Sequence, residues 1–278
     1  MNNSVLASIA YPNFDPVIFR FGPLAVRWYG VAYLLGFLLA YLLLRKMVRR
    51  GRLQVTLEEL TDLLGWLVAG VIVGGRAGWW LVYHRGPLET WYEPVAVWHG
   101  GMSFHGALTG VVLVLAAWSR LRQVPFLHLA DSLSLVAPVG LFLGRIANFI
   151  NAELVGRPTE LPWGVLFPGE QVARHPSQRY EAILEGPILL MALWICRRLR
   201  LREGSLAALF LIGYGCIRFM VEFVRQPDEQ VGFIAFSWLT MGQALSLFLP
   251  IIGLLLLWLL HRRPGLSPDP DDLRKGIP

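Results

Sequence analysis

The hydrophobic residues of this 278-residue chain gather in long runs separated by short polar segments. A helix needs about 20 apolar residues to cross the hydrocarbon core of a bilayer, with a range of about 17–25. The windows that meet or approach this length are residues 28–44, 63–83, 102–118, 129–150, 182–196, 205–224 and 237–260. The pattern therefore predicts an all-α integral membrane protein with about seven transmembrane helices.

The segments between and beside these windows complete the predicted organisation. Prolines 12, 16 and 23 interrupt an N-terminal arm, which we expect to lie along the outer membrane surface. Residues 151–180 combine four prolines with Trp163 and Phe167, a composition too apolar for a linker, and predict a small packed outer head domain. The chain then divides into an arm (1–27), four helices (28–150), the head or cap (151–180), three helices (181–260) and a disordered cytoplasmic tail (261–278).

The distribution of Lys and Arg predicts the orientation. The loops at 45–52, 120–122 and 197–202, together with residues 262–263, hold 13 basic residues, against seven in the arm and the remaining loops. Cytoplasmic loops carry the excess of positive charge in membrane proteins. We therefore expect the N-terminus outside and the C-terminus in the cytoplasm.

Composition narrows the class of protein further. Hydrophobic residues make up 55% of the chain and charged residues only 16%, and the mean hydropathy is +0.52. Average soluble domains carry about 25% charged residues, so a soluble or disordered chain is excluded. Cys196 and Cys216 are too few for a disulfide framework or a zinc site. The net charge of +6 indicates no nucleic-acid partner, because most basic residues flank the spans.

Seven ionisable residues fall inside or beside the predicted spans: Arg76, His105, Asp131, Arg145, Glu185, Arg218 and Glu222. With the predicted orientation, all except Asp131 map to the outer half of the membrane. One arginine there could snorkel to the interface, but several on different helices favour a polar site. Arg218 and Glu222 are four residues apart and could form a structural ion pair instead. The excess of arginine is suited to binding a phosphate group.

The sequence of residues 144–158 is GRIANFINAELVGRP. It resembles the signature of the bacterial prolipoprotein diacylglyceryl transferases. Further segments agree in family order: GGRAGWWLVY from Gly74, GGMSFHGALTG from Gly100, HPSQRYE from His175 and YGCIRFMVEFVRQPD from Tyr214. The resemblance implies a multi-pass enzyme of the bacterial plasma membrane, with its active site facing the outer leaflet and without a cofactor. It would transfer the diacylglyceryl group of phosphatidylglycerol to the lipobox cysteine of a preprolipoprotein, which releases glycerol 1-phosphate.

That reaction needs a base for the thiol and a cationic site for the phosphate. His105 is the natural base, because imidazole accepts and returns a proton near neutral pH. Glu222 is the rival base, although pairing with Arg218 would lower its basicity. Arg145 and Arg218 are the expected phosphate clamp. The predicted catalytic residues are therefore His105, Arg145, Arg218 and Glu222.

A second group of residues is expected to bind the lipid or support the site. The predicted lipid-binding residues are Arg145, Asn148, Asn151, Glu153, Gly156, Arg157, Tyr29, Tyr214 and Arg76. Three residues of the HPSQRYE segment, His175, Gln178 and Glu181, are expected to hold the cap and to pair with an arginine. No metal site is expected.

Three other classes of membrane protein agree less well with the sequence. A transporter predicts polar groups at mid-membrane and an internal repeat, and a zinc-dependent intramembrane protease predicts an HExxH helix; the sequence has none of these. A membrane scaffold leaves the arginine cluster unexplained.

Overall fold

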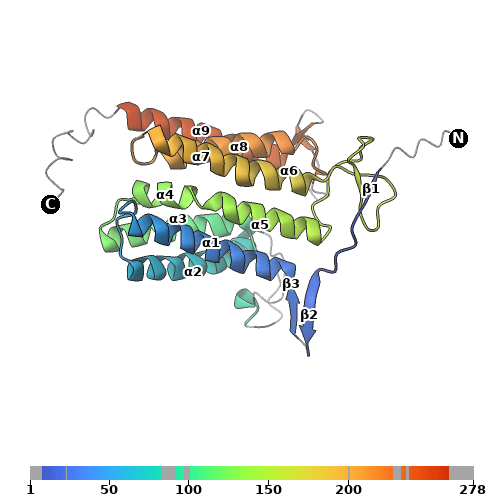
Figure 1. Ribbon diagram of the computed structural model, residues 1–278, viewed down its shortest axis with the longest axis horizontal. Coiled ribbons are helices and arrows are strands. Elements are labelled where there is room, and N and C mark those ends of the chain that lie inside the picture. The colour runs from blue at the N-terminus through green and yellow to red at the C-terminus, as the bar shows by residue number, and fades with distance from the viewer. Residues whose placement is uncertain are drawn as a thin grey trace. The chain divides into compact units, whose positions relative to one another are not determined.

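The computed structural model describes residues 8–22, 24–82, 90, 92–96, 101–199, 201–227, 233–235 and 238–262. Most of them are helical (Figure 1). The helices are α1 (Trp28–Arg49), α2 (Leu57–Val82), η1 (Glu93–Val95), α3 (Phe104–Arg122), α4 (Phe126–Ser134), α5 (Ala137–Ile150), α6 (Ser177–Ile183), η3 (Leu184–Ile188), α7 (Leu189–Cys196), η4 (Arg197–Leu199), α8 (Ser205–Val221) and α9 (Met241–Arg262). Residues 263–278 of the predicted tail (261–278) lie outside the described residues.

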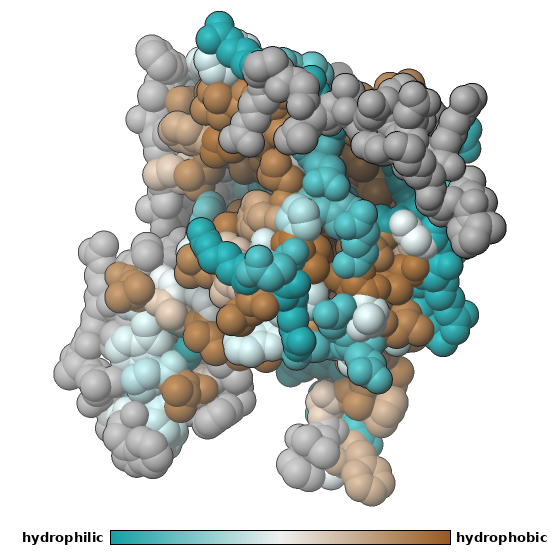
Figure 2. All heavy atoms as spheres, turned by 90° about the vertical axis from the view of Figure 1, so that its left-hand side faces the viewer, coloured by the Kyte–Doolittle hydropathy of each residue, from teal (hydrophilic) through white to brown (hydrophobic). Residues whose placement is uncertain are grey.

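Helices α1, α2 and α9 are long and apolar enough to cross a membrane. Helices α4 and α5 form a fourth candidate span as a bent pair, and α8 is a shorter apolar helix. Many apolar side chains of these helices stay exposed, for example Leu34 at 71% and Leu254 at 58%. Hydrophobic residues also cover large areas of the face shown in Figure 2. Such exposed apolar surface suits a lipid environment.

Two predicted spans are interrupted, and proline explains both breaks. The window 129–150 divides at Leu135 and Val136, because Pro138 lies in the first turn of α5. The fifth window contains the π-helical turn η3, in which Gly186 has non-helical angles just before Pro187. Proline lacks an N–H and clashes with the carbonyl four residues earlier, so the regular helix cannot continue through it.

The structure also contains short strands, which the sequence pattern does not predict. Strand β1 (Ile9–Ala10) pairs in parallel with β4 (Val165–Leu166), β2 (Val17–Phe21) pairs with β3 (Leu24–Arg27) in a hairpin, and β5 (Phe233–Ala235) pairs with β6 (Leu239–Thr240). The expected surface arm therefore contains a β-hairpin. These strands have two to five residues, which is too short for alternation to identify them.

The chain forms two compact units, Met1–Ala40 with Leu133–Pro278, and Tyr41–Ser132. In the first unit, α5, α6, η3, α7, α8 and α9 pack in succession (Figure 1). A small core lies beside them, where Tyr11, Phe149, Val165 and Phe167 are buried together. The hydroxyl of Tyr11 donates to the carbonyl oxygens of Phe149 and Ile150 at 3.0 and 2.7 Å. The N-terminal segment is thus fastened to the C-terminal end of α5.

In the second unit, α2 packs closely on α3. A Cβ atom at Gly74 would collide with the Gly106 carbonyl oxygen, and one at Gly78 would lie 2.6 Å from the Gly106 Cα. Only glycine permits this approach of the two backbones. The glycines spaced four residues apart on α2 therefore allow its close packing on α3.

Candidate active site

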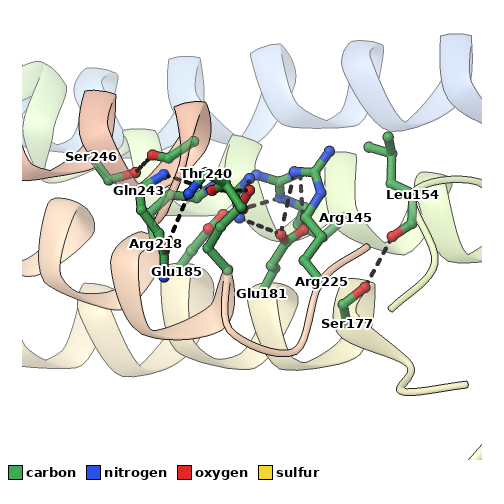
Figure 3. Close-up of polar contacts among 12 residues, drawn as sticks. Arg145, Leu154, Ser177, Glu181, Glu185, Arg218, Arg225, Thr240, Gln243 and Ser246 are labelled. Atoms are coloured by element: carbon green, nitrogen blue, oxygen red, sulfur yellow. Dashed lines mark hydrogen bonds and ion pairs between the residues drawn. The ribbon is translucent and has the colours of Figure 1, made fainter. Parts of the chain in front are cut away.

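Arg145 lies near the end of α5 and faces two glutamates of a neighbouring segment (Figure 3). Its Nη1 atom is 3.0 Å from Glu181 Oε2, and its Nε atom is 3.1 Å from Glu185 Oε2. Glu181 and Glu185 are four residues apart on α6 and η3, so they share a helix face. Both carboxylates are buried, with exposures of 1% and 0%. The counter-charges of Arg145 thus come from a segment outside its own helix.

Arg218 of α8 joins the same cluster. Its Nη1 atom is 2.8 Å from Glu181 Oε1, and its Nη2 atom is 2.8 Å from Glu222 Oε2. The ion pair between Arg218 and Glu222, which their four-residue spacing predicts as an alternative, is therefore present in the structure. Arg225, which follows α8, lies 3.8 Å from Glu181 Oε1. Burial and the nearby Arg218 lower the pKa of the Arg225 guanidinium. Glu181 contacts all three arginines and connects α5, α6 and α8.

These ion pairs balance the charges of the cluster. Three arginines (145, 218 and 225) face three glutamates (181, 185 and 222). The expectation of excess positive charge is therefore wrong for this cluster, because buried arginines need nearby counter-charges.

The pairing still leaves donors for an anion. A guanidinium has five N–H donors, and the glutamates engage two on Arg145 and two on Arg218. About three donors remain on each arginine. The side chains keep 15% and 12% exposure. The glutamates therefore orient two arginines whose remaining N–H groups can bind phosphate oxygens.

The predicted polar residues after Arg145 form a hydrogen-bonded turn. Glu153 Oε1 accepts from Asn148 Nδ2 at 2.8 Å and from Asn151 Nδ2 at 3.5 Å. Gln178 Nε2 donates to the Glu153 carbonyl oxygen at 2.6 Å, and the Ser177 hydroxyl donates to Leu154 at 2.9 Å. Gln178 thus holds the turn to α6, as expected for a residue that fastens the cap.

Gly156 and Arg157 pack within the protein. A Cβ atom at Gly156 would lie 2.5 Å from the His175 carbonyl oxygen and 2.6 Å from that of Val224. Arg157 Nε donates to the Arg225 carbonyl oxygen at 2.9 Å. These contacts join residues 156–157 to the turn after α8, so both residues have a structural role.

His175 belongs to a separate polar chain in the cap. Its Nδ1 atom is 3.3 Å from the Tyr180 hydroxyl, which accepts from Trp163 Nε1 at 2.8 Å. Burial lowers the pKa of the His175 imidazole and raises the pKa of Tyr180. Neutral His175 can accept the Tyr180 proton at Nδ1. His175 therefore links to Tyr180 and Trp163, and among the described residues its side chain makes no hydrogen bond to Arg145, Arg218 or Arg225. Its role in holding the cap stays a prediction.

The two predicted tyrosines make aromatic contacts on their own helices. Tyr29 lies beside Tyr33 on α1, with 3.5 Å between their hydroxyl oxygens. Tyr214 stacks on Phe210 and lies one helical turn before Arg218 on α8. Tyr214 thus lies on the same helix as Arg218, and the head-group roles of both tyrosines stay predictions.

Arg76 has another environment, in the second unit. Its guanidinium donates to the carbonyl oxygens of Pro94, Gly101 and Glu93 at 3.1, 3.1 and 2.5 Å, and it lies over the Trp79 ring. Arg76 is only 6% exposed. These contacts fasten α2 to the segment before α3, and the head-group role of Arg76 stays a prediction.

His105 also lies in the second unit, in the first turn of α3. Ser103 caps this helix through the Gly106 N–H at 3.3 Å, and the His105 carbonyl oxygen accepts from Thr109. The His105 residue is exposed. Its role as a base stays a prediction from the sequence.

Two residues of the cluster, Glu185 and Arg225, are not among the predicted site residues. The four-residue spacing of Glu181 and Glu185 places both on one helix face and is a signal that could identify Glu185. Among the described residues, no group of three or more His, Cys, Asp and Glu is arranged to hold a metal ion.

The apolar helices and the buried arginine–glutamate cluster define the class of protein: a helical membrane protein with a polar site suited to an anionic group. The profile of the prolipoprotein diacylglyceryl transferases matches residues 16–259. The chain belongs to this family.

Curated relatives agree with the family match, and all three that follow are named phosphatidylglycerol–prolipoprotein diacylglyceryl transferase. The protein of Rhizobium meliloti (strain 1021) is 46% identical over 260 residues, which cover 90% of this chain and 93% of the relative. That of Solidesulfovibrio magneticus is 47% identical over 267 residues, or 93% and 97% of the two chains. That of Allorhizobium ampelinum is 42% identical over 282 residues, or 98% of each chain.

Proposed function

We propose that this protein transfers the diacylglyceryl group of phosphatidylglycerol to the lipobox cysteine thiol of preprolipoproteins. The observation that carries the proposal is the pair of arginines, Arg145 and Arg218, which share Glu181 as a partner and keep further N–H donors, in a chain of this family. A phospholipid whose phosphate becomes the leaving group fits such a pair.

The chemistry is a substitution at carbon. The cysteine thiolate attacks the glyceryl carbon bonded to the phosphate oxygen, a C–S bond forms, the C–O bond breaks, and glycerol 1-phosphate leaves. Negative charge grows on the phosphate oxygens as that bond breaks. Arg145 and Arg218 stabilise this charge, and removing one preorganised donor of this kind typically costs about 10²–10³ in rate. No cofactor takes part in this scheme.

The thiol must lose its proton, because a free cysteine has a pKa near 8.5. Both carboxylate oxygens of Glu222 already have partners, Arg218 and the Thr240 hydroxyl. We therefore favour His105. The test is the pH–rate profile of His105→Gln: an unchanged rate and profile would move the role to Glu222 or to water.

The head-group glycerol is the natural ligand for the turn after α5. Asn148, Asn151 and Glu153 carry the amide and carboxylate groups that bind hydroxyls, and they follow Arg145 directly. Tyr214 offers a further hydroxyl one turn from Arg218.

We further propose seven spans in a bacterial plasma membrane, with the N-terminus and the cap outside, the C-terminus in the cytoplasm and the site toward the outer leaflet. The four candidate spans and the loop charges support this arrangement. Fusions of alkaline phosphatase in the 151–180 segment and of a fluorescent protein at the C-terminus test it. Both reporters should be active, because the phosphatase works only outside the cytoplasm and the fluorescent protein fluoresces in the cytoplasm. An inactive phosphatase in the 151–180 segment together with a dark C-terminal fusion would refute the orientation.

The activity is tested with purified protein in vesicles that contain labelled phosphatidylglycerol and a lipobox peptide. We expect lipidation of the peptide cysteine together with release of glycerol 1-phosphate in equal amounts. A peptide whose cysteine is replaced by serine is the control. Release of the phosphate without lipidation would indicate a lipid hydrolase instead.

A further inference from the structure

The start of α9 carries a buried capping box. The Thr240 N–H donates to Gln243 Oε1 at 3.0 Å, and the Gln243 N–H donates to the Thr240 hydroxyl oxygen at 3.1 Å. Thr240 and Gln243 are 2% and 0% exposed. This reciprocal pair satisfies two backbone donors that the beginning of a helix otherwise leaves without partners.

The same threonine hydroxyl reaches out of the helix. It donates to Glu222 Oε1 at 3.0 Å. A hydroxyl has one proton, so accepting from the Gln243 N–H directs that proton toward Glu222. Gly242 lies against this carboxylate, since a Cβ atom there would be 2.5 Å from Glu222 Oε1. The carboxylate thus also benefits from the positive end of the α9 dipole.

The other oxygen of Glu222 leads to the arginine cluster. Arg218 Nη2 lies 2.8 Å from Glu222 Oε2, so a continuous chain runs from Gln243 through Thr240 and Glu222 to Arg218 (Figure 3). We propose that Thr240 and Gln243 are positioning residues that hold Glu222, and through it the guanidinium of Arg218, in the orientation that binds the leaving phosphate. This inference rests on the proposed transferase function.

The choice of glutamine at position 243 agrees with this role. Its Nε2 atom is buried and makes no hydrogen bond with the described residues, so the amide is present although its two N–H donors are unused there. Glutamate is the other residue typical of this capping position. A glutamate there would place a second negative charge near Glu222, which would compete for Arg218.

The test compares Thr240→Val, which removes the hydroxyl at nearly constant volume, with Thr240→Ser, which keeps it. The control is Ser246→Ala on the same helix, because among the described residues the Ser246 hydroxyl donates only to the Gly242 carbonyl oxygen. For Thr240→Val we expect kcat to fall about tenfold or more, below the about 10²–10³ for loss of a direct donor. KM for phosphatidylglycerol should change less than about twofold, because the interaction acts in the transition state.

Thr240→Ser should restore kcat to within about twofold of the wild type, and Ser246→Ala should leave it unchanged. The inference is overturned if Thr240→Val keeps its kcat, if the serine variant is equally slow, or if the whole effect falls on KM. Should the valine variant not fold, Gln243→Met replaces it, with the same expected fall in kcat.

A stability cycle separates this inference from the proposed function. The apparent melting temperatures of Thr240→Val, Glu222→Gln and the double variant should be non-additive, whereas Ser246→Ala and Glu222→Gln should add. If the wild type itself releases no glycerol 1-phosphate, the proposed function fails. Additive shifts of Thr240→Val and Glu222→Gln would refute the Thr240–Glu222 contact, and with it the inference, whatever the activity.

Discussion

Replacing Arg145 by alanine should destabilise the protein as well as stop transfer. Glu181 keeps Arg218 at 2.8 Å, but Glu185 is 0% exposed and has Arg145 as its only ion-pair partner among the described residues. Removing one member of a buried ion pair typically costs about 3–5 kcal/mol, because the remaining charge stays buried without compensation. Arg145→Ala should therefore lose about 3–5 kcal/mol of unfolding free energy.

A second substitution separates this loss of stability from the loss of activity. Glu185→Gln removes the stranded charge, so the double variant Arg145→Ala/Glu185→Gln should be more stable than Arg145→Ala alone. The coupling between the two substitutions should be about 0.5–3 kcal/mol. Neither variant should transfer the lipid at a measurable rate, because the phosphate donors of Arg145 are absent from both.

The measurements are the apparent melting temperature in detergent micelles and the release of glycerol 1-phosphate from vesicles. The matched control is Glu185→Gln alone, which keeps an acceptor for the Arg145 Nε–H. If the double variant is less stable than Arg145→Ala, or Arg145→Ala is as stable as the wild type, the assignment of the ion pair is wrong. Near-normal transfer by Arg145→Ala would refute its role at the phosphate.

Three further predictions concern the supporting structure. Gly106→Ala should lower the free energy of unfolding by about 1–3 kcal/mol, because the new Cβ atom would lie 2.8 Å from the Gly78 Cα. The control is Gly65→Ala, whose Cβ atom would have no atom within 4 Å, and thermal unfolding should show it more stable by up to about 1 kcal/mol. Tyr11→Phe should lose about 0.5–1.5 kcal/mol and loosen the N-terminal segment in hydrogen exchange; equal protection would contradict this. Since burial lowers the pKa of His175, the unfolded chain takes up a proton first as the pH falls below the ordinary value of 6.5, so stability should decrease there. His175→Asn should remove that part of the pH dependence of the melting temperature. An unaltered slope would show that His175 does not cause it.

Much of the organisation could be predicted because its causes are local in the chain. The hydrophobic runs locate the apolar helices, and four of the predicted spans coincide with helices or a helix pair that are long and apolar enough to cross a membrane. The four-residue spacing of Arg218 and Glu222 predicts their contact, because helix geometry alone brings such residues together. The signature from residue 144 to 158 likewise identifies the family without any tertiary information.

The sequence by itself thus determined the membrane class, the family and the residue types of the site. Only the tertiary structure decided how they combine. Glu181 joins Arg145 and Arg218 from a third segment, and Thr240 reaches Glu222 from a fourth, at separations of 18 to 37 residues along the chain. Such contacts depend on how helices pack, and packing is set by side-chain shape across elements, which no periodicity along one chain segment encodes. For that reason the cluster that reads as excess positive charge in the sequence is balanced in the fold.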